Sequence, residues 1–495
     1  MERNHIMGKT LNIKNRIFYI FILCFAVFIA ADDQTVIVTL LPSMVVDLGI
    51  SVGELNKISW TITSYLLGFT IVMPIAGKLC DKYGCRNTLI TSLLFFSLGS
   101  LLVGITTNIP NNILFPSKLN WLIFFRFIQA MGGGAVIPIS IASISIILEK
   151  KYWIYGFGLI GASAEAGGVV GPLWGSLILK IWDWPAAFYI NLPLSFFVIA
   201  LIFTMPKTSI SIVRIKLIDT LIISMILILL TVLISEFNNL GFFKIILISI
   251  LLILTLVEII KVKLYGQDLI PNELIYSKTF LLTSITHFLL GCSLIIVMVV
   301  IPLSGSTLYQ LENIEVGLSL LKLTAFIGIG SIIGTIISKF SSSIAMITGS
   351  ILVTAGTFLY SKNLDIPTNE INYIFFVLGI GFGLFIVPIH NAGFHNVKEN
   401  IRGITSSMIS LSRMIGMIFG LSLMTTIGTA RFSELVTGIQ IFSIDPIVQN
   451  GINNEINNAG LEVFIEIMQG AFIFSLVTFI AVLLLSYVYE LKKSK

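Results

Sequence analysis

Charged residues are scarce in this chain. They make up 11% of the 495 residues, whereas hydrophobic residues make up 56%, and the mean hydropathy is +0.99. Water-soluble domains carry about 25% charged residues, so this composition excludes a soluble globular protein and predicts an integral membrane protein. The net charge of +5 does not indicate nucleic-acid binding, because the basic residues stand beside the apolar segments.

Cysteine and histidine are also rare, with four of each. The cysteines stand at positions 24, 80, 85 and 292 and the histidines have no metal-ligand spacing, so neither a disulfide framework nor a zinc site is expected. Cys80 and Cys85 are predicted to face the cytosol, where thiols stay reduced. The sequence contains no P-loop and no HExxH motif. We therefore expect a protein that is not an enzyme, has no ATP site, and uses no cofactor or metal.

What the sequence has in abundance is long apolar runs. A transmembrane helix needs about 20 mostly apolar residues, and we count fourteen predicted spans. They cover residues 17–41, 57–77, 87–107, 120–142, 154–180, 186–205, 217–235, 242–261, 280–302, 317–338, 344–360, 371–391, 404–428 and 463–488.

Lysine and arginine residues gather on one side of these spans. With a cytoplasmic N-terminus, the predicted inner segments contain 21 of them and the predicted outer segments contain six. Basic residues concentrate in cytoplasmic loops, so this asymmetry supports an even number of spans and places both termini in the cytoplasm. We expect a multi-pass protein of the cell membrane. Its first helix is expected to be retained rather than cleaved as a signal.

The spans divide into two groups of six and a central pair. Residues 1–206 are predicted to form an N-terminal six-helix bundle and residues 280–495 a C-terminal one. Residues 207–279 supply two inserted helices, followed by a segment at 264–279 along the inner surface. A long, polar, Asn-rich outer loop is expected at 429–462.

The polar segment 77–86 between the second and third spans carries one acid and three bases. Its glycines allow a sharp turn, and Asp81 can accept charge-assisted hydrogen bonds. Cys85 stands where a base is usual in the pattern that this segment resembles. That pattern is the loop signature of the major facilitator superfamily, matched here by Gly77, Leu79, Asp81, Lys82, Gly84 and Arg86.

Further motifs resemble those of the fourteen-helix drug:proton antiporters within this superfamily. The end of the first span, residues 33–42, is similar to their L-D-x-T-I-V-N-V-A-L-P motif, with Asp32 in place of the leucine. Residues 126–134 resemble their R-x-x-Q-G motif, and residues 182–193 resemble W-R-W…I-N-x-P. A glycine row similar to the antiporter motif of the fifth span is formed by Gly167, Gly171, Pro172 and Gly175.

This resemblance covers nearly the whole chain and implies an all-α integral membrane protein of the major facilitator fold. It implies transport by alternating access, driven by the proton gradient. The implied partners are protons, membrane lipid and a small-molecule substrate, here a lipophilic cation, with no nucleic acid and a monomeric state. The segment 77–86 would then close the inner gate through the charges of Asp81 and Arg86. The glycine row would make a close contact between the two halves.

Ionisable residues inside the spans form the candidate site, because charges within a membrane are costly and usually face a cavity or a partner. From the helical rise, Asp33 lies about 12 Å and Arg126 about 9 Å below the outer face. Asp32 and Asp33 are therefore within reach of Arg126 if their helices are neighbours. Burial favours the neutral form of such a carboxyl group, whereas a nearby arginine favours its charged form. A proton-coupled site needs these two influences to compete. The alternative is a static ion pair that fixes helix packing.

Three other intramembrane charges have separate interpretations. Glu165 is predicted to be a second proton site or a selector for cations, or else a hydrogen-bonded carboxyl against a neighbouring helix. Arg413 is expected to form a structural or gating pair, and Lys322 is expected to extend its amine toward the surface. Aromatic residues such as Tyr65 are expected at lipid-facing or interfacial positions, with some lining a drug cavity.

The leading prediction is a proton-coupled exporter of amphipathic, cationic compounds. An exporter of one endogenous metabolite, peptide or siderophore is an alternative, because a fold does not fix a substrate. A non-transporting sensor on the same fold is a second alternative. The loop signature and the glycine row argue against the sensor, since static packing would need neither.

Overall fold

The computed structural model describes most of the chain, and every regular element in the described ranges is a helix. The described residues are 12–50, 55–110, 117–149, 152–206, 217–235, 243–265, 274, 277–368, 370–394, 397, 402–437 and 446–493. The first bundle contains α2 (Ile13–Asp47), α3 (Leu55–Tyr83), α4 (Cys85–Gly104), the short 3-10 helix η2 (Thr106–Asn108), α5 (Lys118–Ile147), α6 (Trp153–Ile181) and α7 (Pro185–Ile202). Next come α8 (Leu217–Ser235) and α9 (Phe243–Tyr265), and the second bundle contains α11 (Lys278–Thr307), α12 (Asn313–Ser338), α13 (Ser342–Lys362), α14 (Asn372–Gly383), α15 (Ile386–Gly393), α16 (Arg402–Val436) and α17 (Pro446–Lys493).

The helices form where the sequence is apolar, because a helix satisfies its own backbone hydrogen bonds in lipid. Within the described residues, ten helices are long and apolar enough to cross a membrane. This confirms the prediction of an all-α membrane protein. Helices α3, α6, α8 and α9 lie at the other predicted spans, and the number of membrane crossings stays a prediction.

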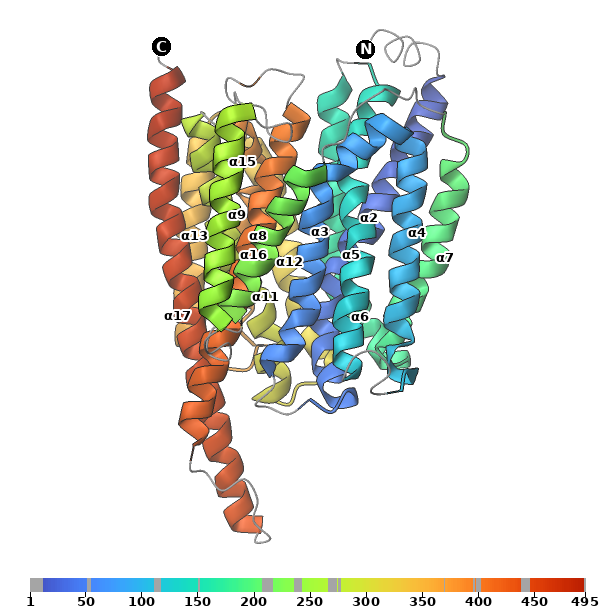
Figure 1. The fold of residues 1–495 in the computed structure, drawn as a ribbon. Coiled ribbons are helices and arrows are strands. Elements are labelled where there is room, and N and C mark those ends of the chain that lie inside the picture. Colours follow the sequence, from blue (N-terminus) through green and yellow to red (C-terminus); the bar gives the residue numbers. More distant parts are fainter. Residues whose placement is uncertain are drawn as a thin grey trace.

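The helices pack as two bundles that stand side by side (Figure 1). In the first bundle α2 packs against α6, and α5 packs against α3 and α4. In the second, α11 packs against α16 and α17, and α12 packs against α14. The bundles meet where α6 contacts α12 and α3 contacts α16. The predicted inner-surface segment falls largely on residues 266–273, which lie outside the described residues.

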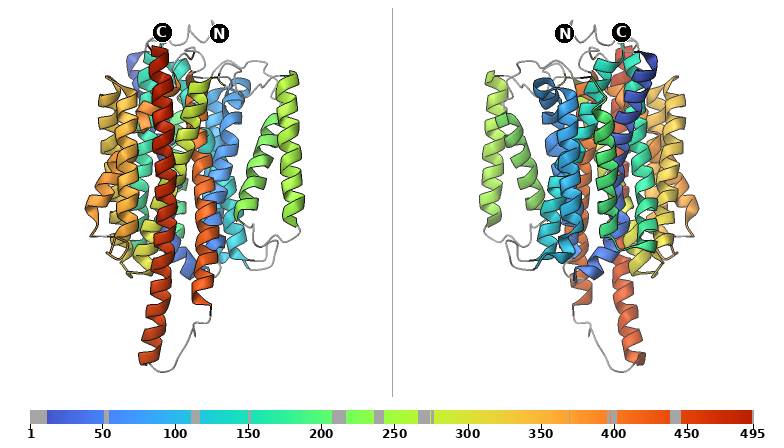
Figure 2. Two further views of the ribbon diagram at one scale, coloured as in Figure 1. Left: turned by 90° about the vertical axis from the view of Figure 1, so that its left-hand side faces the viewer. Right: turned by 90° about the vertical axis from the view of Figure 1, so that its right-hand side faces the viewer.

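Helices α8 and α9 stand at the edge of the molecule (Figure 2). They pack against each other, and α8 also contacts α3 and α16. One face of α9 carries large apolar side chains that are more than half exposed, such as Leu252 and Ile253. Such a face suits contact with lipid acyl chains, as expected of helices at the edge of a membrane protein.

The last turns of α16 and the first turns of α17 project beyond the bundles, on the side opposite the start of α2 (Figures 1 and 2). The prediction of a loop at 429–462 is therefore wrong about the secondary structure, since α16 continues to Val436 and α17 begins at Pro446. Residues 438–445 lie outside the described residues. The polar composition did predict exposure, but it did not exclude a helix.

One arginine links α16 to α17 through ion pairs. Arg431 donates from Nε to Glu466 at 3.0 Å, and from Nη2 to Glu462 at 2.9 Å, both on α17. Its Nη1 also donates to Glu434 on α16 at 2.9 Å. Each surface ion pair contributes little alone, but a shared fork of three carboxylates fixes the spacing of the two helices.

Candidate functional site

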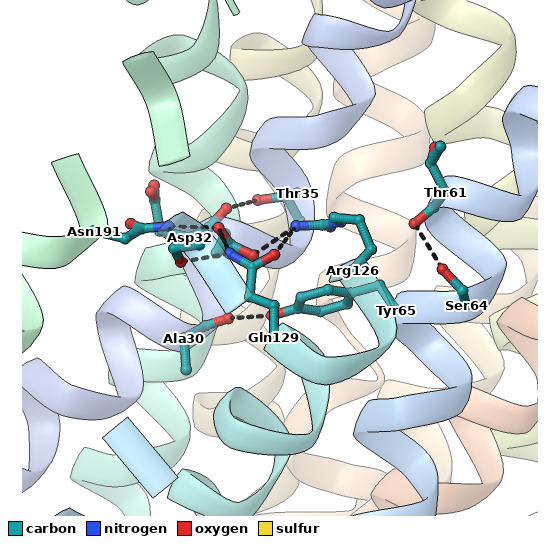
Figure 3. Close-up of polar contacts among 11 residues, drawn as sticks. Ala30, Asp32, Thr35, Thr61, Ser64, Tyr65, Arg126, Gln129 and Asn191 are labelled. Atoms are coloured by element: carbon teal, nitrogen blue, oxygen red, sulfur yellow. Dashed lines mark hydrogen bonds and ion pairs between the residues drawn. The ribbon is translucent and has the colours of Figure 1, made fainter. Parts of the chain in front are cut away.

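Asp33 lies at the centre of a buried polar network in the first bundle. Figure 3 shows its partners Arg126, Gln129 and Asn191. Its Oδ2 accepts a hydrogen bond from Arg126 Nη1 at 2.8 Å. Its Oδ1 accepts from Gln129 Nε2 at 2.9 Å and from Asn191 Nδ2 at 2.6 Å. Asp33 is 1% exposed, and Arg126 and Gln129 are 0% exposed. The prediction that Asp33 and Arg126 lie within reach of each other is confirmed.

The arginine is held by rings as well as by the carboxylate. Its Cζ lies 4.1 Å from the ring centroid of Tyr65 and 5.4 Å from that of Phe188. Its Nη1 also donates to Gln129 Oε1 at 2.7 Å, whereas Nε and Nη2 have no hydrogen-bond partner in the described part of the chain. Aromatic faces attract a cation, but the charge that balances Arg126 comes from Asp33.

Sequence reasoning missed several members of this network. The sequence left lipid-facing, interfacial and cavity-lining positions open for aromatic residues such as Tyr65. The structure buries Tyr65 in the first bundle: it is 1% exposed, and its hydroxyl donates to the Ala30 carbonyl at 3.2 Å. Ser100 of α4 accepts a hydrogen bond from Gln129 at 2.7 Å. Asn191 carried a signal, because it stands in the segment that resembles I-N-x-P, but that motif does not reveal which side chain the amide contacts.

Asp32 does not join the network, although it is the next residue on the same helix. Successive residues differ by about 100° around a helix, and Asp32 lies where α2 packs on α6, with its backbone beside Gly167 and Gly171. It is 9% exposed, and its Oδ1 has no hydrogen-bond partner among the described residues. Glu165 belongs to α6, but its side chain is outside the described part of the structure.

A cavity of ≈ 100 Å³ lies between the two bundles, beside the network. Helix α2 contributes Ala31, Gln34 and Thr35 to its wall, so the helix that carries Asp33 on one face lines the cavity with another. The wall is mainly apolar and includes Leu294, Met298, Ile327, Phe382, Phe385, Met414 and Met417.

The second bundle supplies basic groups to this cavity. Arg413 of α16 and His287 of α11 line it, and the lining residues that the structure describes include no carboxylate. His287 Nδ1 lies 2.9 Å from the Ile409 carbonyl oxygen, and its ring meets the ring of His390 edge to face at 5.9 Å. Lys322 lies elsewhere: its Nζ donates to Asn372 Oδ1 at 2.7 Å, at the first residue of α14. His395 is outside the described residues.

The glycine row of α6 packs directly on α2. A Cβ at Gly167 would collide with the Phe28 carbonyl, one at Gly171 with Thr35, and one at Gly175 with Thr39. The three glycines thus make a close contact within the first bundle and not the contact between the two halves expected of them. The reason is that these glycines face α2, and a face of small residues allows close approach of whichever helix packs against it.

A different face of α6 contacts the second bundle. Thr324 Oγ1 of α12 donates to the Val169 carbonyl at 3.1 Å, and a Cβ at Gly317 would collide with Ser176. Pro172 lies inside α6, and its carbonyl is the next neighbour of Gly317. Helix α6 therefore connects α2 to α12 through two close contacts.

The loop signature forms the corner between α3 and α4. Gly77 lies within α3 with open space around it, and Gly84 adopts a φ of 85°, which favours glycine. Arg86 Nη1 donates to the Met205 carbonyl at 3.0 Å, beyond the end of α7. The backbone of Asp81 belongs to the last turn of α3, and its side chain is not among those described.

The cysteines of this corner differ from the prediction. Cys80 and Cys85 form a disulfide, with their Cα atoms 4.2 Å apart. The expectation of four unpaired cysteines is therefore wrong for these two, while Cys24 and Cys292 are free. A spacing of five residues within a continuous helix would not suggest pairing, but the turn at Gly84 brings the two side chains together.

Comparison with known proteins agrees with this architecture. Residues 23–421 match the family described as Major Facilitator Superfamily, so this chain belongs to that superfamily and is a multi-pass membrane transporter. It is similar to a probable triacylglyceride transporter of Mycobacterium bovis, with 28% identity over 440 residues covering 84% of this chain and 83% of that one. It is equally similar to the multidrug transporter protein MdtP of Bacillus subtilis, with 28% identity over 431 residues covering 84% and 76%.

Solved structures show the same fold. A bacterial homologue of the human lysosomal transporter Spinster, inward-facing and unoccupied, gives a TM-score of 0.64 at 12% identity, covering 96% of this chain and 99% of that one. The xylose transporter XylE from E. coli, partially occluded and inward open, gives 0.58 at 12% identity, covering 90% and 96%. At this identity the likeness shows the fold alone.

Proposed function

We propose that this protein is a proton-coupled exporter of amphipathic compounds that works by alternating access. The observation that carries the proposal is the double role of α2. One face of this helix holds Asp33 in a buried ion pair, and another face lines the cavity between the bundles. A change in the charge of Asp33 therefore acts on a helix that also forms the wall of the substrate cavity.

Protonation of Asp33 unbalances the network. The carboxylate loses its charge, and Arg126 is left as a buried cation, a situation that costs about 3–5 kcal/mol in proteins. The cost falls when α2 and α5 move so that Arg126 reaches water or another partner. Because Gln34 and Thr35 move with α2, the cavity changes shape in the same step. This links proton binding to substrate release.

The cavity wall supports an amphipathic substrate. Apolar and sulfur-containing side chains supply most of its surface, and a few polar groups sit among them. Methionine adapts to ligands of varied shape, which suits a broad range of compounds. The prediction of a cationic substrate rests on the acidic residues Asp32, Asp33 and Glu165. Asp33 does not line the cavity, so it would affect such a substrate indirectly, through movement of α2.

Lipid export is the second candidate. It is favoured by the relatives named as triacylglyceride transporters, which match this chain as well as the named multidrug transporter does. The apolar wall suits acyl chains as readily as drug-like rings. The other exporters considered from the sequence, for a metabolite, peptide or siderophore, require more polar contacts than the described wall offers.

The experiment uses proteoliposomes with an imposed pH gradient and a pH-sensitive dye inside. Lipophilic cations, neutral amphipaths and a fluorescent glycerolipid are added separately to wild type and to Asp33→Asn. We expect at least one class to trigger proton movement in wild type and none to do so in the variant. Proton movement that survives in Asp33→Asn contradicts the coupling role, and no movement with any class in the folded wild type contradicts proton-coupled export.

A matched control separates loss of coupling from loss of folding. Asp47 lies on the same helix, and its Oδ2 accepts a hydrogen bond from Trp184 Nε1 at 2.9 Å, outside the network. Asp47→Asn removes one acid of α2 but keeps that acceptor. It should retain proton movement, so a loss in both variants indicates a general effect on α2.

A further inference from the structure

We propose that Cys80 and Cys85 are a reversible thiol–disulfide modification site that locks the corner between α3 and α4. The site takes small-molecule thiols and disulfides as its reaction partners. It does not depend on the transport activity proposed above. It adds redox control to the loop signature, at a position where the superfamily pattern usually has a base.

The first observation is the placement of the two cysteines. The chain has four, and two of them meet as a bonded pair five residues apart. Cys80 ends the apolar part of α3, and Cys85 is the first residue of α4. Both are buried, at 2% and 4% exposure. The other two, Cys24 and Cys292, lie on α2 and α11 and have no cysteine partner.

The second observation concerns the hydrogen bonds at the corner between α3 and α4, which the disulfide spans. Gly84 lies between the two helices, and its N–H donates to the Cys80 carbonyl at 2.9 Å. Thr88 Oγ1 of α4 donates to the Leu79 carbonyl of α3 at 3.1 Å. Without the disulfide, these hydrogen bonds are left to hold the corner, and such bonds open readily near the surface. With it, the corner is covalently closed.

The third observation is the connection to α7. Arg86 follows Cys85 directly, and it donates to the Met205 carbonyl while its guanidinium lies 5.5 Å from the ring centroid of Phe203. Fixing Cys85 to Cys80 therefore also fixes the residue that joins this corner to the chain just after α7. The bond stiffens one end of the first bundle, not only a surface loop.

The compartment makes this pair a reversible site. The distribution of basic residues predicts that the corner faces the cytoplasm, where structural disulfides are rare and those that occur are usually transient or redox-sensing. Reduction uses two small-molecule thiols. The thiolate of the first attacks one sulfur of the disulfide and forms a mixed disulfide, which the second thiol then cleaves. The Cys80–Cys85 bond breaks, a small-molecule disulfide forms, and the two cysteines gain two electrons and two protons.

Burial makes the exchange depend on conformation. At 2% and 4% exposure, neither sulfur is open to attack until the corner loosens. Reduction should therefore proceed faster when the ends of α3 and α4 separate. Oxidation by a small-molecule disulfide such as oxidised glutathione is the reverse reaction, with the same stoichiometry.

The first test counts thiols in the full-length protein in lipid nanodiscs. Samples are treated with dithiothreitol or with oxidised glutathione, quenched in acid, denatured and alkylated with N-ethylmaleimide for intact mass measurement. We expect four labels after reduction and two after oxidation, because Cys24 and Cys292 stay free. The double variant Cys24→Ser/Cys292→Ser should lose two labels in each state. Equal label counts after reduction and oxidation overturn the proposal.

The second test measures locking without transport. Hydrogen exchange of residues 77–88 is compared between oxidised and reduced protein, with Cys80→Ser/Cys85→Ser as the permanently open reference. Exchange should be several-fold slower in the oxidised form, and the reduced form should match the variant. Equal exchange in the two redox states overturns the locking role. Neither readout uses transport, so failure of the exporter proposal leaves both results interpretable.

Discussion

The two bundles place different chemical groups at corresponding positions. In the first, α2, α4 and α7 meet at Asp33, Ser100 and Asn191, and α5 adds Arg126. The halves of this superfamily are repeats of each other, so α11, α13 and α17 hold the corresponding places in the second bundle.

The second bundle has neutral groups there. Thr357 of α13 and Ser475 of α17 have their hydroxyl oxygens 2.9 Å apart, and Ser293 of α11 donates to the Ala471 carbonyl at 3.2 Å. Hydroxyls hold helices together without carrying charge. The comparison teaches that one helical arrangement supports both a charged network and a neutral one. The proton coupling proposed above therefore assigns the proton to the first bundle.

The largest expected effect comes from breaking the charged network. Asp33→Asn leaves Arg126 as a buried cation and should lower the free energy of unfolding by about 3–5 kcal/mol. Thermal unfolding in detergent, followed by intrinsic fluorescence, measures the fall in Tm. An unchanged Tm means that another group balances Arg126. Asp47→Asn, at the C-terminal end of α2, should change Tm little.

Removing both charges sharpens the comparison by making the first bundle resemble the second. Asp33→Asn combined with Arg126→Gln leaves no unbalanced charge, so most of the lost stability should return. Proton movement in proteoliposomes should stay absent. If the double variant still moves protons, Asp32 or Glu165 carries the coupling, and the contrast between the bundles loses its functional meaning.

Close helix packing should behave alike in both bundles. A Cβ at Gly171 would collide with α2, and one at Gly420 would approach the Cys292 backbone of α11 to 2.7 Å. Each Gly→Ala substitution should cost about 1–3 kcal/mol through overpacking. Gly161→Ala is the control, because nothing lies within 4 Å of a Cβ there. Urea or thermal unfolding of the three variants side by side would show whether the two costs differ.

The smallest effect is expected in the neutral network. Thr357→Val removes the bond to Ser475, whose hydroxyl still donates to the Phe472 carbonyl at 2.7 Å. The loss should be about 0.5–1.5 kcal/mol, with unchanged proton movement. A loss of proton movement in this variant would show that the second bundle takes part in coupling.

The sequence predicted the fold well because apolar length is a strong physical signal. Helices occur at each predicted span, and the basic residues suggested an orientation that the structure does not test. The pairing of Asp33 with Arg126 followed from their similar depth, since buried charges need partners. Asp32 shows the limit of that argument, because depth alone does not say which way a side chain points.

Other features depend on contacts that sequence does not encode locally. The glycine row packs on whichever helix lies against it, and Tyr65 contacts Arg126 and the Ala30 carbonyl across helix interfaces. The Cys80–Cys85 pair depends on one positive φ at Gly84. In the segment 429–462, polarity indicated exposure, whereas its described residues form the end of α16 and the start of α17, which Arg431 links.

Helix α17 has 48 residues and is about 72 Å long at the usual helical rise. That length exceeds the roughly 40–45 Å of a whole bilayer, so α17 is a rigid rod with one part in the membrane and one part in solution. Any tilt of the second bundle swings the projecting end through a larger arc than the part in lipid. A fluorescent label placed there would report the working cycle of the transporter from a position that touches neither the cavity nor the buried ion pair.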